Sequence, residues 1–364
     1  MEMNGQAPQH IVMHPLLEPP KEVLAQILPQ KSLSVLDFLS FKLPAIMIMT
    51  KHVTVKAFFS KDQPSLGNAQ LIQDSPIPSM HILAVLSKST SEAIENGAFS
   101  LKCAHLTVVM LHHKHLKPWI QAEQNLERRT QLWKNEGGEE ARTLVMKIYN
   151  ALTCISWSGT LDGFAVAEPV VELAVYATDD WLSDVHENQM LDLLQRRIQH
   201  QPQSQKIEIE NIYFYGFLKK AYEVHSSGEY KGRYFVCARE TGDAMASGFG
   251  SCIGFLVNIN ENHWVAVVID FKSSTIFYGD SIYMKPPTGF LTVLHWWTHH
   301  HTGQHFEEKS LIITHQKDSF SCGLLSFNAL AHHVLPSEYP LIMASQVRID
   351  RLKVMLDVID RHLN

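Results

Sequence analysis

The stretch HQKDSFSCGLLSFNAL, residues 315–330, begins as a polar, turn-rich segment and continues as an amphipathic helix. One cysteine, Cys322, stands at the junction, in the first turn of the expected helix. Unpaired backbone N–H groups and the positive end of the helix dipole favour a thiolate over a thiol at such a position. A lone cysteine is otherwise an ordinary small apolar core residue. Whether Cys322 is a nucleophile therefore depends on what other groups the chain supplies.

The elements around this stretch predict an α+β fold. Residues 250–259 and 263–271 are apolar and rich in branched side chains, which is typical of buried strands, and residues 274–281 are expected to complete a hairpin with the second strand. One helix is expected at 178–199, with Thr178 or Asp179 as its N-cap. A short strand is expected at 310–315. Further helices are predicted at 289–301, 322–335 and 346–363.

The N-terminal part of the chain carries no chemical motif. Short helices are expected at 21–28 and 34–41, and a strand-like segment at 45–59. Residues 105–155 predict a strand or helix and then two longer helices, with a break near NEGGEE, residues 135–140. We therefore divide the chain into residues 1–165, an α/β region of unknown fold and function, and residues 168–364, where the chemical motifs lie.

Composition excludes several classes of protein. The chain has 364 residues, is 45% hydrophobic and has a formal net charge of -6, with no long lysine or arginine run, so direct nucleic-acid binding is not expected. Neither a secretory signal nor an uncharged apolar segment of about 18 residues is evident, so no membrane association is expected. Five widely spaced cysteines without a CxxC pair predict reduced thiols in an intracellular protein, nuclear or cytoplasmic.

Two histidine clusters raise the alternative of a metal site. His295, His299, His301 and His305 include pairs four residues apart, and HHKH occupies residues 112–115. No cysteine or carboxylate pattern completes a ligand set at either cluster. We therefore expect neither a metal nor another cofactor.

The C-terminal half supplies the groups that a nucleophilic thiol needs. A thiol requires a base, a group that orients the base, and a donor that stabilises the oxyanion formed on attack at a carbonyl. His263 stands at the head of one expected strand and Asp280 at the end of the next, so an antiparallel hairpin can bring them together. Gln316 precedes Cys322 by six residues, and a turn can return its amide to the thiol.

These residues also carry a family resemblance. The segments WLSD (181–184), NINENHWVAVVID (258–270), YGDS (278–281) and QKDSFSCG (316–323) resemble the motifs of the ubiquitin-like-protein-specific cysteine proteases, the family of the SUMO (sentrin) proteases. The resemblance covers roughly residues 175–345. It implies the cysteine protease fold of that family, with a central mixed sheet flanked by helices.

The resemblance also implies roles for individual residues. His263 is then the general base, Asp280 its orienting acid, Gln316 an oxyanion donor and Cys322 the nucleophile. Trp181 and Trp264 match tryptophans that cover a narrow tunnel for a diglycine tail, and Asp184 matches an acid that contacts a basic residue of the modifier. Ser321 departs from the aspartate common before the nucleophile, which leaves the chemistry intact but the identity of the modifier open.

The expected function is cleavage after the C-terminal diglycine of a ubiquitin-like modifier, with that modifier or its conjugates as partner. Two alternatives stay open. The first is a protease of the same fold that processes another substrate, as in viral or transposon-encoded enzymes, and the second is an inactive module that binds a modifier. The complete set His263, Asp280, Gln316 and Cys322 favours an enzyme.

Overall fold

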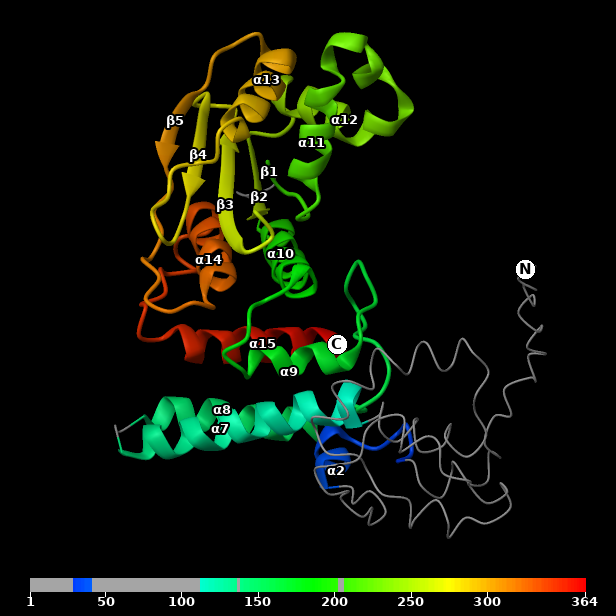
Figure 1. Ribbon diagram of the computed structural model, residues 1–364, viewed down its shortest axis with the longest axis vertical. Coiled ribbons are helices and arrows are strands. Elements are labelled where there is room, and N and C mark those ends of the chain that lie inside the picture. Colours follow the sequence, from blue (N-terminus) through cyan, green and yellow to red (C-terminus); the bar gives the residue numbers. More distant parts are fainter. Residues whose placement is uncertain (1–28, 41–111, 136–137, 202–205) are drawn as a thin grey trace, which may run out of the picture. The chain divides into compact units, whose positions relative to one another are not determined.

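The structure is a computed structural model that describes residues 29–40, 112–135, 138–201 and 206–364. The chain divides into two compact units, residues 1–120 and 121–364. The described α-helices, coloured along the sequence in Figure 1, are α2 (Val35–Ser40), α7 (Lys117–Asn135), α8 (Glu139–Leu152), α9 (Leu173–Tyr176), α10 (Asp184–Gln199), α11 (Phe214–Glu223), α12 (Val236–Ala246), α13 (Phe290–Thr302), α14 (Cys322–Val334) and α15 (Val347–Leu363). Short helical turns are η1 (His112–Leu116), η2 (Val170–Glu172), η4 (His225–Ser227), η5 (Glu229–Lys231) and η6 (Arg233–Phe235).

A five-stranded mixed sheet forms the centre of the second unit. Its strands lie in chain order, β1 (Ile207–Ile209), β2 (Cys252–Ile259), β3 (His263–Asp270), β4 (Thr275–Gly279) and β5 (Glu307–Ser310). The central pairs β2–β3 and β3–β4 are antiparallel. The edge strand β1 is parallel to its neighbour β2, and the edge strand β5 is parallel to its neighbour β4. The predicted α+β fold, with a mixed sheet flanked by helices, is confirmed.

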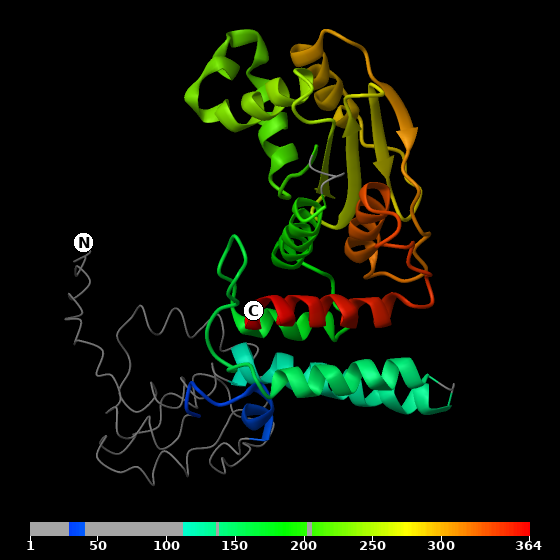
Figure 2. The same cartoon turned by 180° about the vertical axis from the view of Figure 1, so that it is seen from behind.

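Helices cover both faces of this sheet (Figures 1 and 2). One set of alternate residues on β2 and β3, which includes Phe255 and Val267, packs into a core with α11, α12 and α13. On the opposite face α14 packs against β3, and a side chain at Gly254 would meet Leu330 of that helix at 2.4 Å. Because both faces of the sheet are covered, β2 and β3 are almost continuously apolar and do not alternate between apolar and polar residues. Such continuous apolar runs are usual for strands of parallel sheets.

The hairpin that joins β2 to β3 determines where His263 lies. Asn260 and Glu261 both have positive φ angles, 55° and 58°, and the Asn262 N–H donates to the Ile259 carbonyl. Two successive positive φ angles are typical of a type I′ turn, the turn that matches the twist of a two-stranded hairpin. Ile259 then pairs with His263, which places the histidine at the first position of β3.

Two expected element boundaries are wrong. The helix predicted from residue 178 begins at Asp184, and its N-cap is Ser183 rather than Thr178 or Asp179, because the Thr178 hydroxyl instead bonds within a local turn to Asp180. The strand expected at 310–315 is β5, at residues 307–310. Strand β4 ends at Gly279, so residues 311–315 have no continuous partner strand.

In the N-terminal half, the helix expected at 34–41 is confirmed as α2, and the two longer helices are confirmed as α7 and α8 with a break between them. The expected helix at 21–28 and the strand-like segment at 45–59 lie outside the described residues. The boundary near residue 165 stays a prediction. No helix among the described residues is both long and apolar enough to cross a membrane.

Candidate active site

His263 and Asp280 meet across the β3–β4 hairpin. The His263 Nε2 lies 2.9 Å from the Asp280 Oδ1, and both residues are largely buried. The Asp280 Oδ1 also accepts a hydrogen bond from the Ile282 backbone N–H at 2.8 Å. The Asp280 Oδ2 accepts one from the Tyr278 hydroxyl. Because Asp280 occupies Nε2, the Nδ1 of His263 is the nitrogen left for another partner.

The thiol of Cys322 lies close enough to His263 to influence the pKa of the imidazole. Burial is the largest single influence on His263 and lowers its pKa, but hydrogen bonds to Asp280 and to Cys322, together with their negative charges, raise the pKa to about 9. The structure therefore brings His263, Asp280 and Cys322 together. A histidine with such a pKa is an imidazolium at neutral pH, which is the natural counter-ion of a thiolate.

Cys322 is the first residue of α14, where the backbone donors of the first helical turn have no intrahelical acceptor. The turn that leads into this helix is built by Asp318, whose Oδ1 accepts hydrogen bonds from the backbone N–H groups of Phe320 and Ser321, both at 2.9 Å. An aspartate that accepts from N–H groups two and three residues later stabilises a tight turn. The polar segment 315–321 thus forms the turn that places Cys322 at the N-terminus of α14.

Gln316 lies at the start of the same loop and is buried. Its Oε1 accepts a hydrogen bond from the Ser281 hydroxyl at 3.0 Å, and its Nε2 donates to the Asp318 carbonyl at 2.8 Å. The amide nitrogen also lies 3.5 Å from the Asp318 Oδ1, and this longer contact is the one that an oxyanion would replace. The loop is tied to the Asp280 segment as well, since the Gln316 backbone N–H donates to the Ser281 carbonyl. The oxyanion role of Gln316 stays a prediction.

The two predicted tunnel tryptophans differ in burial. Trp181 is 51% exposed and its indole N–H donates to the Ser319 carbonyl in the catalytic loop. Trp264 is 4% exposed and its indole N–H donates to the Leu182 carbonyl at 3.0 Å. Each indole is therefore held by a hydrogen bond to a backbone carbonyl.

A cleft of about 480 Å³ adjoins Trp264. Asp184, the first residue of α10, is exposed and also lines this cleft. Aromatic side chains and one lysine of α11 complete a partly apolar, partly charged wall. The other lining residues are Asn211, Ile212, Tyr213, Tyr215, Gly216, Phe217, Lys220, Val257 and Asn258.

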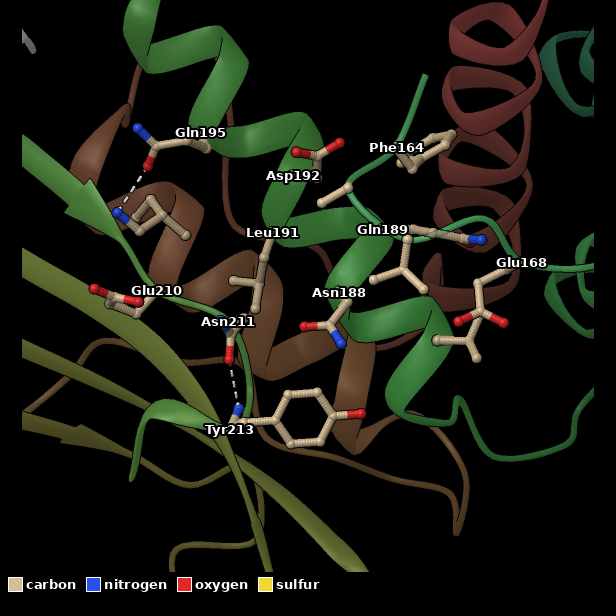
Figure 3. Close-up of a pocket in the computed structure, with 14 residues that line it drawn as sticks. Phe164, Glu168, Asn188, Gln189, Leu191, Asp192, Gln195, Glu210, Asn211 and Tyr213 are labelled. Carbon is tan, nitrogen blue, oxygen red and sulfur yellow. Dashed lines mark hydrogen bonds between the residues drawn. The ribbon is translucent and has the colours of Figure 1, made fainter. Parts of the chain in front are cut away.

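A second cavity, of about 310 Å³, lies between α10 and the segments 164–168 and 209–213 (Figure 3). It contains none of the predicted site residues. Three carboxylates, of Glu168, Asp192 and Glu210, line it, and none of its lining residues is a lysine or arginine. The Gln195 side chain closes one side, because its carbonyl oxygen accepts the Ile209 backbone N–H at 2.8 Å.

Glu187 is a buried acid that no sequence pattern predicted. This residue of α10 has no solvent exposure, and neither carboxylate oxygen has a hydrogen-bond partner. Burial, followed by the negative charge of Cys322, raises the pKa of Glu187 well above its ordinary value. An acid in the first turn of a helix is ordinarily exposed and favourable there, so pattern alone cannot distinguish Glu187 from a surface residue.

The histidines of α13 have separate partners. His295 bonds to Glu308 and His301 to Asp243, each at 2.8 Å, and the Tyr230 hydroxyl lies 2.9 Å from the other ring nitrogen of His301. Within the described parts of the chain, no three histidine, cysteine or acidic side chains are grouped as metal ligands. The HHKH segment lies only partly within side chains that the structure describes.

A histidine that contacts both a carboxylate and a thiol at a helix N-terminus is an arrangement used by cysteine proteases. Residues 180–359 match the family model described as the Ulp1 protease family, C-terminal catalytic domain. The chain therefore carries a catalytic domain of this family, a SUMO-protease-like cysteine protease domain. The family resemblance stated from the sequence motifs is confirmed, and so is the expectation of a cysteine protease.

Solved structures with similar folds were also found, while no curated protein sequence matches. The yeast Ulp1 protease domain in complex with Smt3, the yeast ortholog of SUMO, is 20% identical over 57% of this chain and 90% of that chain, with a TM-score of 0.44. The Ulp1-like SUMO protease catalytic domain of Chaetomium thermophilum is 15% identical over 56% and 81%, with a TM-score of 0.41. The Xanthomonas campestris effector XopD bound to ubiquitin is 19% identical over 48% and 90%, with a TM-score of 0.33.

Proposed function

We propose that the domain cleaves the peptide or isopeptide bond that follows the C-terminal diglycine of a ubiquitin-like modifier, with Cys322 as nucleophile. The observation that carries this proposal is the hydrogen bond of His263 to Asp280, together with the influence of the nearby Cys322 thiol on the pKa of His263. A partner of the ubiquitin-like class is what membership of the Ulp1 protease family implies.

In the acylation half of the reaction, the Cys322 thiolate attacks the carbonyl carbon of the last glycine and the carbonyl π electrons move to oxygen. The resulting oxyanion accepts hydrogen bonds from the Gln316 amide and the Cys322 backbone N–H. When the tetrahedral intermediate collapses, the bond from carbon to nitrogen breaks, and the His263 imidazolium gives its proton to the departing amine. A thioester between the modifier and Cys322 remains.

In the deacylation half, His263 is neutral and takes a proton from water as the water oxygen attacks the thioester carbon. The carbon–sulfur bond then breaks, and the thiolate and imidazolium are restored. Asp280 holds the imidazole through Nε2 in both halves, so that the same Nδ1 faces the sulfur and the reacting groups. No cofactor is required by these steps.

Substrate selection is proposed to involve Trp181, Trp264 and Asp184. Rigid indoles on either side of the approach to Cys322 favour residues without a side chain, hence glycine, before the cleaved bond. Asp184 at the cleft beside Trp264 is suited to a lysine or arginine of the modifier. The cleft thus supports recognition of a folded partner rather than of a short peptide alone.

The test is covalent capture. SUMO, ubiquitin and a diglycine peptide, each with a C-terminal vinyl methyl ester, are incubated with the wild type and with Cys322→Ser, and adducts are measured by mass spectrometry. Capture of a modifier by the wild type alone is expected. Capture of the bare peptide alone indicates a protease for other substrates, and reversible binding of a modifier without any adduct indicates an inactive binding module; either result refutes the proposal.

A further inference from the structure

Helix α8 and residues 121–135 of α7 lie outside the residues that match the protease family but within the same compact unit, residues 121–364. Helix α8 packs along α15, the last helix of the chain. The protease domain therefore has structural neighbours that precede it in the sequence. Arg129, on α7, contacts Asp179 in the segment that precedes α10.

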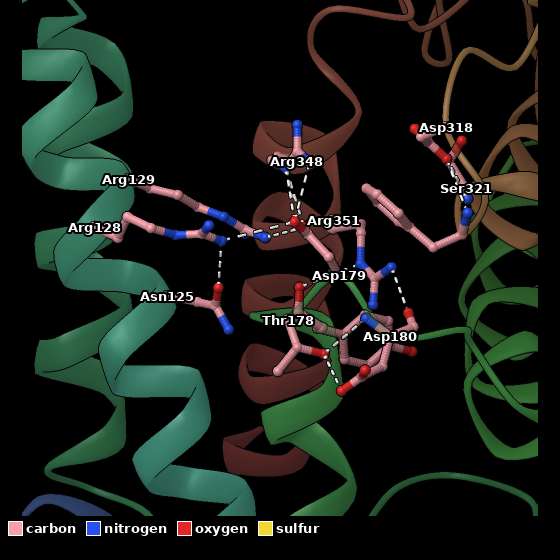
Figure 4. A network of polar contacts seen from close by, with 12 residues as sticks. Asn125, Arg128, Arg129, Thr178, Asp179, Asp180, Asp318, Ser321, Arg348 and Arg351 are labelled. Atoms are coloured by element: carbon pink, nitrogen blue, oxygen red, sulfur yellow. Dashed lines mark hydrogen bonds and ion pairs between the residues drawn. The ribbon is translucent and has the colours of Figure 1, made fainter.

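Arg129 is a nearly buried cation that contacts one carboxylate. Its side chain is 3% exposed and its Nη2 lies 2.6 Å from the Asp179 Oδ1 (Figure 4). Asp179 is shared with Arg348 of α15, whose Nε and Nη2 each lie 3.0 Å from a carboxylate oxygen. The adjacent Arg128 is 62% exposed and 3.8 Å from the same carboxylate. Asp179 therefore joins α7 to α15.

A purely structural explanation accounts poorly for Arg129. Its Nε and Nη1 are buried without a hydrogen-bond partner. A buried ion pair with unsatisfied donors often contributes less to stability than an apolar side chain of the same volume. Burial of Arg129 is therefore unfavourable for stability. Arg129 binds Asp179, the carboxylate that Arg348 also binds.

From Asp179 the contacts continue to the catalytic loop. The guanidinium groups of Arg348 and Arg351 lie over the Phe320 ring, at 5.2 and 5.6 Å from its centre. The Phe320 backbone N–H donates to the Asp318 side chain, and the Asp318 carbonyl accepts the Gln316 amide. A displacement of the Phe320 ring would therefore move the acceptor that holds Gln316.

Arg351 adds a second connection to the same loop. It has no solvent exposure and donates to the carbonyls of Val175 and Asp180, at 2.7 and 2.8 Å, just before Trp181. Trp181 in turn donates to the Ser319 carbonyl. The loop between Gln316 and Cys322 is thus held by two contacts. Phe320 connects it to Arg348, which binds Asp179, and Trp181 connects it to the segment that Arg351 binds at Asp180.

We propose that Arg129 is a positioning residue of the catalytic site, which fixes Asp179 and thereby holds Arg348 on Phe320 and the Gln316 amide in its productive place. This inference rests on the proposed function, because the effect of Arg129 is transmitted through Gln316. It extends the functional unit to a helix that precedes the family match. Arg129 touches neither substrate nor nucleophile.

The experiment is a double-mutant cycle on the full chain. Turnover of SUMO with a C-terminal aminomethylcoumarin amide is measured for Arg129→Met, Gln316→Ala and the double variant, with Arg128→Met as the matched exposed control. Arg129→Met should lower kcat about tenfold with KM within about twofold, since a misplacement of 1 Å can cost about 100-fold. Arg128→Met should retain the wild-type kcat.

In the Gln316→Ala background, Arg129→Met should cost less than about threefold, because its target is already absent. Equal fold losses in both backgrounds, or a wild-type kcat for Arg129→Met, would overturn the inference. If thermal melting shows that Arg129→Met does not fold, Phe320→Leu replaces it in the same cycle with the same expectation. An active Cys322→Ser or a fully active Gln316→Ala would refute the proposed function itself, and the inference with it.

Discussion

The carboxyl group of Glu187 occupies the space beside Gly323, the residue that follows the candidate nucleophile. A Cβ atom at position 323 would lie 2.0 Å from the Glu187 Oε1 and 3.4 Å from the Leu182 Cβ. The first helical turn that carries Cys322 therefore packs directly on a buried acid. Glycine is required at position 323 for this close approach, and not for an unusual backbone angle.

Gly323→Ala should consequently destabilise the domain. Overpacking of a closely filled site costs about 1–3 kcal/mol, and the Glu187 carboxyl has no exposed space into which it can move. Urea unfolding of the single variant and of Gly323→Ala with Glu187→Ala would measure this effect. A loss of stability that persists in full when Glu187 is shortened would show that another contact is responsible.

Glu187→Gln should change how stability depends on pH. The pKa of Glu187 is higher in the folded protein than its ordinary value, so the folded state retains a proton that the unfolded state releases, and wild-type stability falls as pH rises above about 4.5. Glutamine cannot ionise. The stability of the variant relative to wild type should therefore grow by up to about 1.4 kcal/mol per pH unit above that pH. Parallel unfolding curves at each pH, with exposed Glu229→Gln as control, would test this; a constant difference would contradict it.

The buried acid illustrates what a sequence pattern can and cannot predict. The meeting of His263 and Asp280 is predictable because the two residues stand at adjoining strand ends of a hairpin, whereas the place of Cys322 beside them follows from the family resemblance. Glu187 and Arg129 interact through packing between elements that are distant in sequence. Neither residue breaks a helical pattern, so no local signal marks it.

The activity should fall on the alkaline side as His263 loses its proton. Its pKa of about 9 in the folded protein means that the imidazolium persists through neutral pH and disappears as pH rises through about 9. Asp280→Asn removes a charge and a hydrogen bond that raise this pKa. In that variant the alkaline fall of kcat/KM should move to lower pH by about 1 unit or more. The measurement is kcat/KM against pH for the wild type and for Asp280→Asn. If kcat/KM falls at the same alkaline pH in both enzymes, Asp280 does not raise the pKa of His263.

Cys322 should be the thiol that reacts first with iodoacetamide at acidic pH, although Cys154 and Cys237 are exposed. Cys322 is the proposed nucleophile and His263 its proposed base, whereas an ordinary thiol without such a partner is only a few per cent ionised even at pH 7. Burial raises the pKa of Cys252 to about 12, so that residue should stay unmodified. Peptide mapping after limiting alkylation gives the order. Faster labelling of Cys154 or Cys237, or an unchanged rate at Cys322 in His263→Ala, would contradict the thiolate–imidazolium pair.

Strands β2, β3 and β4 and helices α13, α14 and α15 could be predicted because long apolar runs and helical periods are local features of the sequence. Strand β1 and helices α11 and α12 were not predicted. The start of α10 and the position of β5 could not be predicted either. Thr178 is as good a helix cap by type as Ser183, and only the hydrogen bonds around Asp180 decide between them. Strand β5 is made of exposed polar residues, so hydrophobic patterning favoured the neighbouring apolar run.

Cleavage should require glycine at both positions before the scissile bond if Trp181 and Trp264 form the walls of a narrow tunnel. Any Cβ atom there would collide with an indole, and Trp264 cannot move aside without losing its burial and its bond to the Leu182 carbonyl. A strained fit costs about 1–3 kcal/mol and also displaces the carbonyl from Cys322, so kcat/KM should fall more than about tenfold for each alanine. Trp264→Ala should relax this preference while it lowers the overall rate. Modifier substrates that end in Gly-Gly, Ala-Gly and Gly-Ala, assayed with both enzymes, test the tunnel, and equal cleavage of all three by the wild type would exclude it.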